Sequence, residues 1–143
     1  MRRTFWVILA FILLASLGAG VGAACSGSSA SLSASGNDVN VDSSYSGKQV
    51  ELSVGQTLVV TLASNVTTGY SWSLADNSDS SVLSETGNEY ISPQTSLVGA
   101  GGNEKWTFQA LKKGTSIISM EYSRPWEKDT PPAETFDVTV VVK

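Results

Sequence analysis

The chain has 143 residues, of which nine are Lys or Arg and thirteen are Asp or Glu, so its formal net charge is −4. It has no His and one Cys, which excludes Ser-His and Cys-His catalysis, histidine metal sites and an intramolecular disulfide. An acidic chain without clustered Lys and Arg also argues against a nucleic-acid partner. The acidic residues occur singly, so we expect neither an enzyme nor a metal or organic cofactor.

Residues 1–24 have the organisation of a signal peptide. Arg2 and Arg3 form a charged start, residues 5–17 form an almost uninterrupted apolar stretch, and a tail of small residues follows. The apolar stretch is shorter than the about 20 residues that a membrane-spanning helix needs, so a retained membrane anchor is the weaker alternative. Removal of the leader would leave seven basic and thirteen acidic residues, a net charge of −6.

The single cysteine, Cys25, follows the leader directly, in the segment Val21-Gly22-Ala23-Ala24-Cys25. This segment resembles the lipobox of bacterial lipoproteins, in which the cysteine becomes the lipidated first residue of the mature chain. Gly22 departs from that pattern, which usually has an aliphatic residue there. The resemblance implies lipid attachment at Cys25 and a place on the outer face of the cell membrane. The alternative is an ordinary cleavage site and a secreted protein.

Residues 25–46 are rich in Ser and Gly and contain little to bury. This composition predicts a flexible tether that would hold a domain clear of a membrane. Val39, Val41 and Tyr45 could instead add a short edge strand, in which case the domain begins before Lys48.

From residue 47 to residue 143 the pattern predicts an all-β domain. Tyr70, Trp72 and Leu74, for example, alternate with polar residues and so share one face of a strand. The expected strands are residues 49–54, 57–62, 70–74, 105–111, 115–122 and 136–142, with short, weaker candidates at 82–83 and 89–91. Short strands separated by turns predict a sandwich or a barrel, and the length of about 95 residues suits an immunoglobulin-like β-sandwich. Without paired cysteines, its core must be held by burial alone.

Three segments between these strands are unusual for simple connectors. They are residues 65–70 (NVTTGY), 99–102 (GAGG) and 124–126 (RPW). Alternate loops of a sandwich fall at the same end, so the three segments could form one surface. Each also has a purely structural interpretation, because Asn and Gly are good turn residues and a Trp can cover the edge of a core.

Taken in order, the three segments resemble the signatures of the chagasin family, inhibitors of papain-like cysteine peptidases. Residues 65–70 match Asn-Pro-Thr-Thr-Gly-Tyr except at Val66, which replaces the proline. Residues 99–102 match Gly-x-Gly-Gly, and residues 124–126 match Arg-Pro-Trp. Each signature is weak alone, but the ordered set is specific, and the resemblance covers roughly residues 48–143.

The resemblance implies an immunoglobulin-like sandwich that inhibits its peptidase reversibly by occluding the active-site cleft. Thr67 and Thr68 would lie next to the catalytic Cys-His pair of the peptidase. The glycine segment would line one side of the cleft, and Trp126 and Arg124 would contact the other. The implied peptidase-binding residues are Asn65, Val66, Thr67, Thr68, Gly69, Gly99, Gly101, Gly102, Arg124, Pro125 and Trp126.

An alternative function of a different class is a cell-envelope adhesion or scaffold module, which would also use a leader, a tether and a sandwich. Whether the peptidase partner belongs to the same organism or to another is left open by the sequence. Nothing in the sequence requires more than a monomer.

Overall fold

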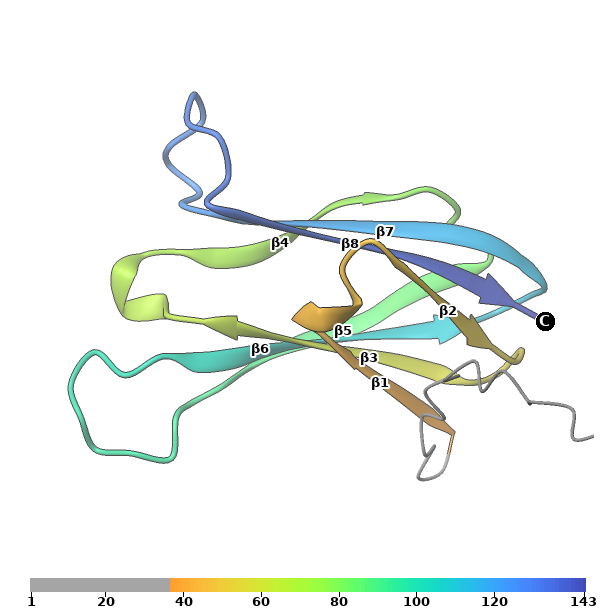
Figure 1. Cartoon of the computed structure of the whole chain (residues 1–143), viewed down its shortest axis with the longest axis horizontal. Coiled ribbons are helices and arrows are strands. Elements are labelled where there is room, and N and C mark those ends of the chain that lie inside the picture. The colour runs from red at the N-terminus through yellow and green to blue at the C-terminus, as the bar shows by residue number, and fades with distance from the viewer. Residues whose placement is uncertain (1–36) are drawn as a thin grey trace, which may run out of the picture. The chain divides into compact units, whose positions relative to one another are not determined.

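The computed structural model describes residues 37–143, and the expected signal peptide, Cys25 and the first part of the expected tether lie outside the described residues. The described chain folds into two facing four-stranded sheets (Figure 1). One sheet has the strand order β1-β3-β6-β5 and the other has the order β2-β8-β7-β4. The all-β sandwich that the sequence predicts is therefore confirmed.

The strands are β1 (Asp38–Asp42), β2 (Lys48–Leu52), β3 (Thr57–Ser64), β4 (Ser71–Asn77), β5 (Leu83–Ile91), β6 (Gly102–Ala110), β7 (Gly114–Ser123) and β8 (Glu134–Val142). Two short 3-10 turns, η1 (Ser43–Tyr45) and η2 (Val66–Thr68), lie between strands. Most strand pairs are antiparallel, whereas β1 runs parallel to β3 and β2 runs parallel to β8.

Strand β1 lies inside the segment that the sequence assigns to the tether, so the boundary at residue 47 needs correction. Val39 and Val41 alternate with polar residues and are buried in the core. Tyr45 also packs against the core, and its turn carries the chain from the first sheet to the second, where β2 begins. Burial of these two valine side chains stabilises the fold, and for that reason β1 belongs to the domain.

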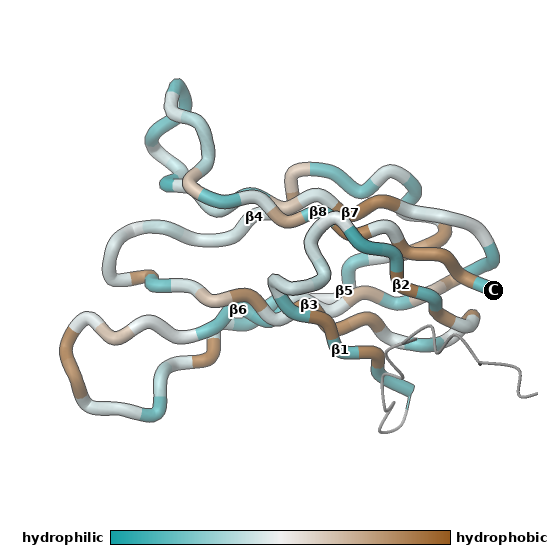
Figure 2. The backbone as a smooth tube through the Cα atoms, in the orientation of Figure 1, coloured by the Kyte–Doolittle hydropathy of each residue, from teal (hydrophilic) through white to brown (hydrophobic). Residues whose placement is uncertain are grey.

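The core is built from the inward-facing residues of both sheets, as strand alternation requires. In β6, for example, Trp106 and Phe108 face inward and are buried, while Thr107 between them is partly exposed. Figure 2 shows the hydrophobic residues concentrated along the strands. A brown stretch in the loop between β5 and β6 is an exception, and Leu97 and Val98 in this loop are exposed.

Strand β5 is one continuous strand where the sequence suggests two short ones. It lies at the edge of its sheet, most of its residues are exposed, and its pairing with β6 is interrupted by a bulge between Glu85 and Gly87. An exposed edge strand has no need for hydrophobic alternation, so the pattern on which the prediction depends is absent there.

Within residues 37–143, no helix is long and apolar enough to cross a membrane. The same residues contain no group of three or more His, Cys, Asp or Glu side chains that could hold a metal ion.

Candidate functional site

The three segments singled out in the sequence lie in loops at one end of the sandwich, on the left in Figure 1. The central loop is residues 65–70, between β3 and β4. The glycine loop is residues 92–101, between β5 and β6, and the tryptophan loop is residues 124–133, between β7 and β8. The turn between β6 and β7 and the C-terminus lie at the opposite end.

Internal hydrogen bonds shape the central loop. Asn65 Oδ1 accepts hydrogen bonds from the backbone N–H of Thr67, at 3.2 Å, and from the Thr67 hydroxyl, at 2.6 Å. The Thr68 hydroxyl donates to the Asn65 carbonyl oxygen at 2.6 Å. Asn65 thus caps η2, a role for which its side chain is well suited. The loop keeps its form through its own polar groups.

Gly69 closes the central loop in a left-handed conformation, with φ of 81°. A side chain at this position would be strained by the backbone alone. It would also lack room, since an added Cβ would lie 2.4 Å from Cη2 of Trp126. Gly69 is therefore required both for the turn and for the contact between the central and tryptophan loops.

Aromatic packing supports the base of the central loop. The backbone N–H of Asn65 donates to the Tyr122 hydroxyl at 2.8 Å. The Tyr122 ring packs between Tyr70, with ring centroids 5.3 Å apart, and Trp72, with centroids 5.1 Å apart. Tyr70 and Tyr122 thus anchor the loop, and no local motif indicates the role of Tyr122 because its partner Asn65 is far away in the sequence.

Glu104 holds the same base from the side of β6. Its Oε1 accepts hydrogen bonds from the Ser64 hydroxyl, at 2.6 Å, and from the backbone N–H of Trp72, at 3.1 Å. It therefore joins the end of β3 to the start of β4. Glu104 stands outside the three signature segments, but its strand parity is that of Trp106 and Phe108, so it must face inward.

Asn65 also connects the central loop to the glycine loop. Its Nδ2 donates to the Gly99 carbonyl oxygen at 3.1 Å. Gly99 has φ of 81°, which favours glycine, whereas a Cβ added at Gly101 would make only an ordinary contact, 3.4 Å from the Ser64 carbonyl oxygen. Of these two expected glycines, Gly99 therefore has a local reason to be glycine.

Gly102 is the one expected contact residue that the structure does not place on the surface. It is buried as the first residue of β6, where it pairs with Ser64. An added Cβ would lie 2.2 Å from the Ile91 carbonyl oxygen and 2.7 Å from the Tyr90 hydroxyl. Its smallness lets β5 and β6 come together, so its place in the Gly-x-Gly-Gly pattern has a packing cause.

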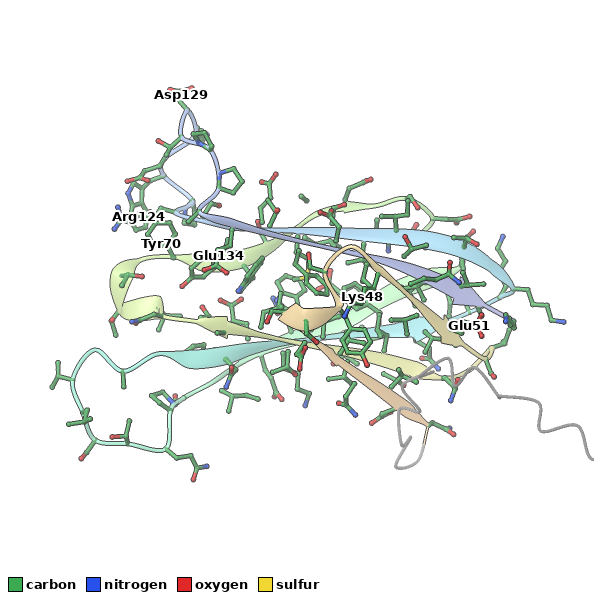
Figure 3. All side chains as sticks on the ribbon, viewed as in Figure 1. Lys48, Glu51, Tyr70, Arg124, Asp129 and Glu134 are labelled. Carbon is green, nitrogen blue, oxygen red and sulfur yellow. The ribbon has the colours of Figure 1, made fainter. Side chains whose placement is uncertain are left out.

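Arg124 connects the tryptophan loop to the central loop. Its Nε donates to the Thr68 carbonyl oxygen at 3.1 Å, and its guanidinium lies over the Tyr70 ring, 4.5 Å from the centroid. Figure 3 shows the two labelled side chains next to each other at the base of the loop. Its Nη1 forms an ion pair with Glu127 at 3.0 Å. Arg124 is thus largely committed to holding the two loops together.

Pro125 and Trp126 form the exposed part of this junction. Trp126 is 65% exposed although its ring touches Gly69, an unusual condition for so large an apolar side chain. Leu97, at 74% exposure, and Val98, fully exposed, add apolar surface on the glycine loop. One end of the domain therefore presents a preformed polar turn between two apolar projections.

The sequence comparison with protein families agrees with this arrangement. A family model described as "Chagasin family peptidase inhibitor I42" matches residues 51–140. The chain belongs to the chagasin family. Chagasin of Trypanosoma cruzi is 30% identical over 101 residues, which cover 68% of this chain and 92% of chagasin. The family membership expected from the three loop signatures is confirmed, and with it the expectation of an inhibitor and not an enzyme.

Solved structures show the same fold as this chagasin-family domain. The cysteine protease inhibitor EhICP2 from Entamoeba histolytica superimposes with a TM-score of 0.68 and 23% identity, covering 74% of this chain and 96% of EhICP2. PbICP-C, solved in complex with falcipain-2, superimposes with a TM-score of 0.57 and 23% identity, covering 75% of this chain and 90% of PbICP-C.

Proposed function

We propose that this chagasin-family chain inhibits papain-like cysteine peptidases reversibly, by filling the active-site cleft with its central, glycine and tryptophan loops. The observation that carries the proposal is that the three signature segments lie at one end of the sandwich and are joined to one another through Asn65 and Arg124. PbICP-C, which has the same fold, was solved in complex with falcipain-2, in keeping with a peptidase partner.

The conformation of the central loop suits occlusion without cleavage. Residues 66–68 form a 3-10 turn, whereas a peptide that adds to a cleft in the manner of a strand is extended. The hydroxyls of Thr67 and Thr68 donate within the loop. The loop would therefore occupy the catalytic centre without presenting a well-placed scissile bond, and no covalent chemistry is needed.

The internal hydrogen bonds also reduce the entropy that binding removes. Ordering a flexible side chain at an interface costs about 0.5–1.5 kcal/mol, and this loop is already ordered by Asn65 in the free domain. Val66, which replaces the family's proline, is 45% exposed at the first position of η2. A proline would fix φ at that position, so Val66 gives up part of the preorganisation.

The flanking loops supply the apolar contacts. Trp and Arg residues are common hot spots at interfaces. The Trp126 ring lies against Gly69 of the central loop, and Arg124 donates to the Thr68 carbonyl oxygen of the same loop. Leu97 and Val98 project from the glycine loop on the other side. An interface of the usual size, on the order of 1,600 Å², would cover all three loops.

Steady-state kinetics test the proposal. Papain and a cathepsin-L-like peptidase are assayed at several substrate concentrations with residues 37–143, which include β1. The expected result is competitive inhibition, in which KM rises with inhibitor concentration and kcat does not change. Full peptidase activity in the presence of micromolar domain would contradict it.

We further propose that the chain is exported and held on the outer face of the membrane by lipid on Cys25. The support is the leader and the lipobox-like segment, which both lie outside the described residues. Since β1 begins at Asp38, roughly 12 residues would link the anchor to the domain, a reach of at most about 40 Å. In cells supplied with labelled palmitate, the wild-type chain should become labelled and the Cys25→Ala variant should not, and an unlabelled wild-type chain would contradict the proposal.

The alternative function, a cell-envelope adhesion or scaffold module, receives no support from the relatives described above. They are named for peptidase inhibition. The three linked loops also have no evident purpose in a module of that class.

A further inference from the structure

A pocket of about 250 Å³ opens beside the central loop. Its lining comes from the central loop, β4, β5 and β6, and consists of Val66, Ser71, Asn88, Glu89, Tyr90 and Glu104. Strand β5 is the edge of one sheet and β4 is the edge of the other, so the pocket lies where the edges of the two sheets meet the loop end.

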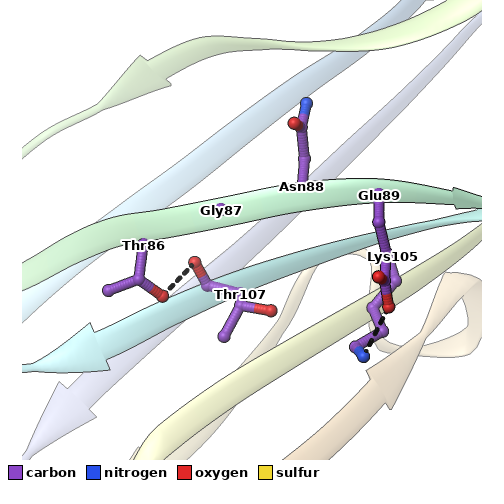
Figure 4. A pocket seen from close by; sticks show the side chains of 6 residues that line it. All are labelled: Thr86, Gly87, Asn88, Glu89, Lys105 and Thr107. Atoms are coloured by element: carbon purple, nitrogen blue, oxygen red, sulfur yellow. Dashed lines mark hydrogen bonds and ion pairs between the residues drawn. The ribbon is translucent and has the colours of Figure 1, made fainter.

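A second hollow near β5 and β6 provides a contrast (Figure 4). Its two charged groups already pair with each other, Lys105 with Glu89 at 2.7 Å, and the Thr86 hydroxyl donates to the Thr107 carbonyl oxygen at 3.1 Å. Asn88 points to the face opposite to that of Glu89 and Lys105, toward the other sheet (Figure 4). This second hollow has no unsatisfied charge.

Glu104 supplies a buried carboxylate to the lining of the first pocket. The side chain is nine-tenths buried, with 8% relative exposure. Oε1 accepts the two hydrogen bonds from Ser64 and Trp72, while no described residue donates to Oε2. One carboxylate oxygen therefore remains for a group that enters the pocket.

The charge of Glu104 also lacks a partner among residues 37–143. The ion pairs found there join Lys105 to Glu89, Arg124 to Glu127 and Lys143 to Glu51. Buried carboxylates are normally paired with a cation, because removal of a charge from water is costly. A buried carboxylate that lines an open pocket thus indicates a cationic ligand.

We infer that this pocket receives a Lys or Arg side chain that the target peptidase carries beside its cleft. The inference rests on the proposed function, since Val66 belongs both to the central loop and to the pocket wall. A peptidase that accepts the loop places its surface across the pocket mouth. The apolar stem of the entering residue packs against Val66, and its charged head reaches Glu104, with Asn88 and Tyr90 as further polar neighbours.

The pocket would act as a specificity determinant. A peptidase with a basic residue at this position gains a charge-assisted hydrogen bond, whereas one without it leaves the carboxylate unpaired under the interface. Inhibition constants should therefore differ between peptidases whose clefts accept the loops equally well.

A ligand titration tests the pocket directly. The full chain is titrated with n-butylguanidinium and, separately, with the uncharged n-butylurea, while amide signals are followed by NMR. The expected result is a saturable shift of the signals of Val66, Ser71, Asn88 and Tyr90 with the cation, at least tenfold weaker with the urea. No saturable shift, or equal shifts with both compounds, would overturn the inference.

A matched pair of variants tests the role in inhibition. Glu104→Gln keeps an oxygen that can accept the bonds from Ser64 and Trp72 but removes the charge. The control, Glu51→Gln, removes a carboxylate that is paired with Lys143 and does not line the pocket. Against a panel of papain-like peptidases, Glu104→Gln should weaken inhibition at least tenfold for some members and less than twofold for others. Glu51→Gln should change inhibition less than twofold throughout.

Equal weakening across the panel would assign Glu104 a purely structural role and overturn the inference, and so would no weakening at all. Inhibition of peptidases without guanidinium binding would overturn this inference and leave the proposed function intact. Guanidinium binding without inhibition of any peptidase would contradict the proposed function.

Discussion

Asn65 forms three separate connections at the loop end of the sandwich, two through its side chain and one through its backbone. Its Oδ1 caps η2, its Nδ2 holds the glycine loop at Gly99, and its backbone N–H is fixed by Tyr122. The sequence signature identifies Asn65 as a turn residue, and only the structure shows these three separate connections.

Two substitutions separate the first two of these connections. Asn65→Ala removes both the cap and the bond to Gly99, whereas Asn65→Asp keeps an oxygen that can cap η2 but cannot donate to Gly99. Loss of a cap costs about 0.5–2 kcal/mol, so the Ala variant should melt lower than the Asp variant. Both should inhibit a papain-like peptidase less well, with the Ala variant weaker. An Ala variant with wild-type inhibition would contradict the proposed role of loop order.

Trp126 is expected to be a major source of binding energy. Trp126→Ala removes an exposed ring from the tryptophan loop and should weaken inhibition by about 2 kcal/mol, roughly 30-fold. Leu111→Ala is the matched control, because Leu111 is 51% exposed in the turn after β6, at the opposite end. The control should inhibit normally, and both variants should melt within about 2 °C of wild type. Equal inhibition by Trp126→Ala and wild type would show that the tryptophan loop is not part of the interface.

At the scale of elements, the alternating pattern in β1 is too short to distinguish a strand from a tether. Val39 and Val41 alternate correctly, but they stand in a Ser-rich, Asn-containing stretch whose composition predicts a tether. Only the parallel pairing with β3 makes the two valines part of the core.

The contribution of β1 can be measured by comparing two chain lengths. A domain that starts at residue 47 lacks β1 and both buried valines, each worth about 1.5–3 kcal/mol of burial. It should be less stable than residues 37–143 by at least about 3 kcal/mol in denaturant unfolding. Equal stability of the two chains would mean that β1 does not belong to the domain.

The turn between β4 and β5 should make the domain sensitive to acid. Hydrogen bonds from the Ser81 side chain and then the Ser81 backbone N–H hold the pKa of Asp79 below its usual value of 3.8. A group with a lowered folded-state pKa stabilises the fold above its unfolded pKa, and this contribution is lost as the pH falls through the folded pKa.

Asp79→Asn should therefore lower the melting temperature near neutral pH. On acidification, the melting temperature of the variant should fall by less than that of wild type. Melting curves between pH 6 and pH 2 measure the difference. Parallel pH profiles for the two proteins would show that Asp79 makes no such contribution.

The sequence predicts the strands that face the core well, including the edge strands β2 and β4, and it predicts the exposed strand β5 poorly. Strands such as β6 and β8 turn alternate residues toward the core, whereas β5 is exposed along most of its length and lacks that constraint. The same distinction applies to the site. Asn65, Gly69 and Trp126 stand in local motifs, but Tyr122 and Glu104 act on residues distant in the sequence, and Gly102 serves packing although it belongs to a motif.

At the scale of the whole molecule, we propose that the sandwich holds three connected loops that together fill a peptidase cleft. The scaffold at the opposite end takes no part in binding, so variation there should leave inhibition unchanged. The tests by substitution depend on this claim, and one binding experiment addresses it without altering the inhibitor.

That experiment measures the affinity of residues 37–143 for papain by calorimetry, once with the cleft free and once with the catalytic cysteine blocked by a bulky covalent inhibitor that fills the cleft. We expect tight binding to the free enzyme and an affinity at least about 100-fold lower for the blocked enzyme, because the central loop has no space to enter. Equal affinity for both forms would place the interface outside the cleft and overturn the proposal that the loops fill it.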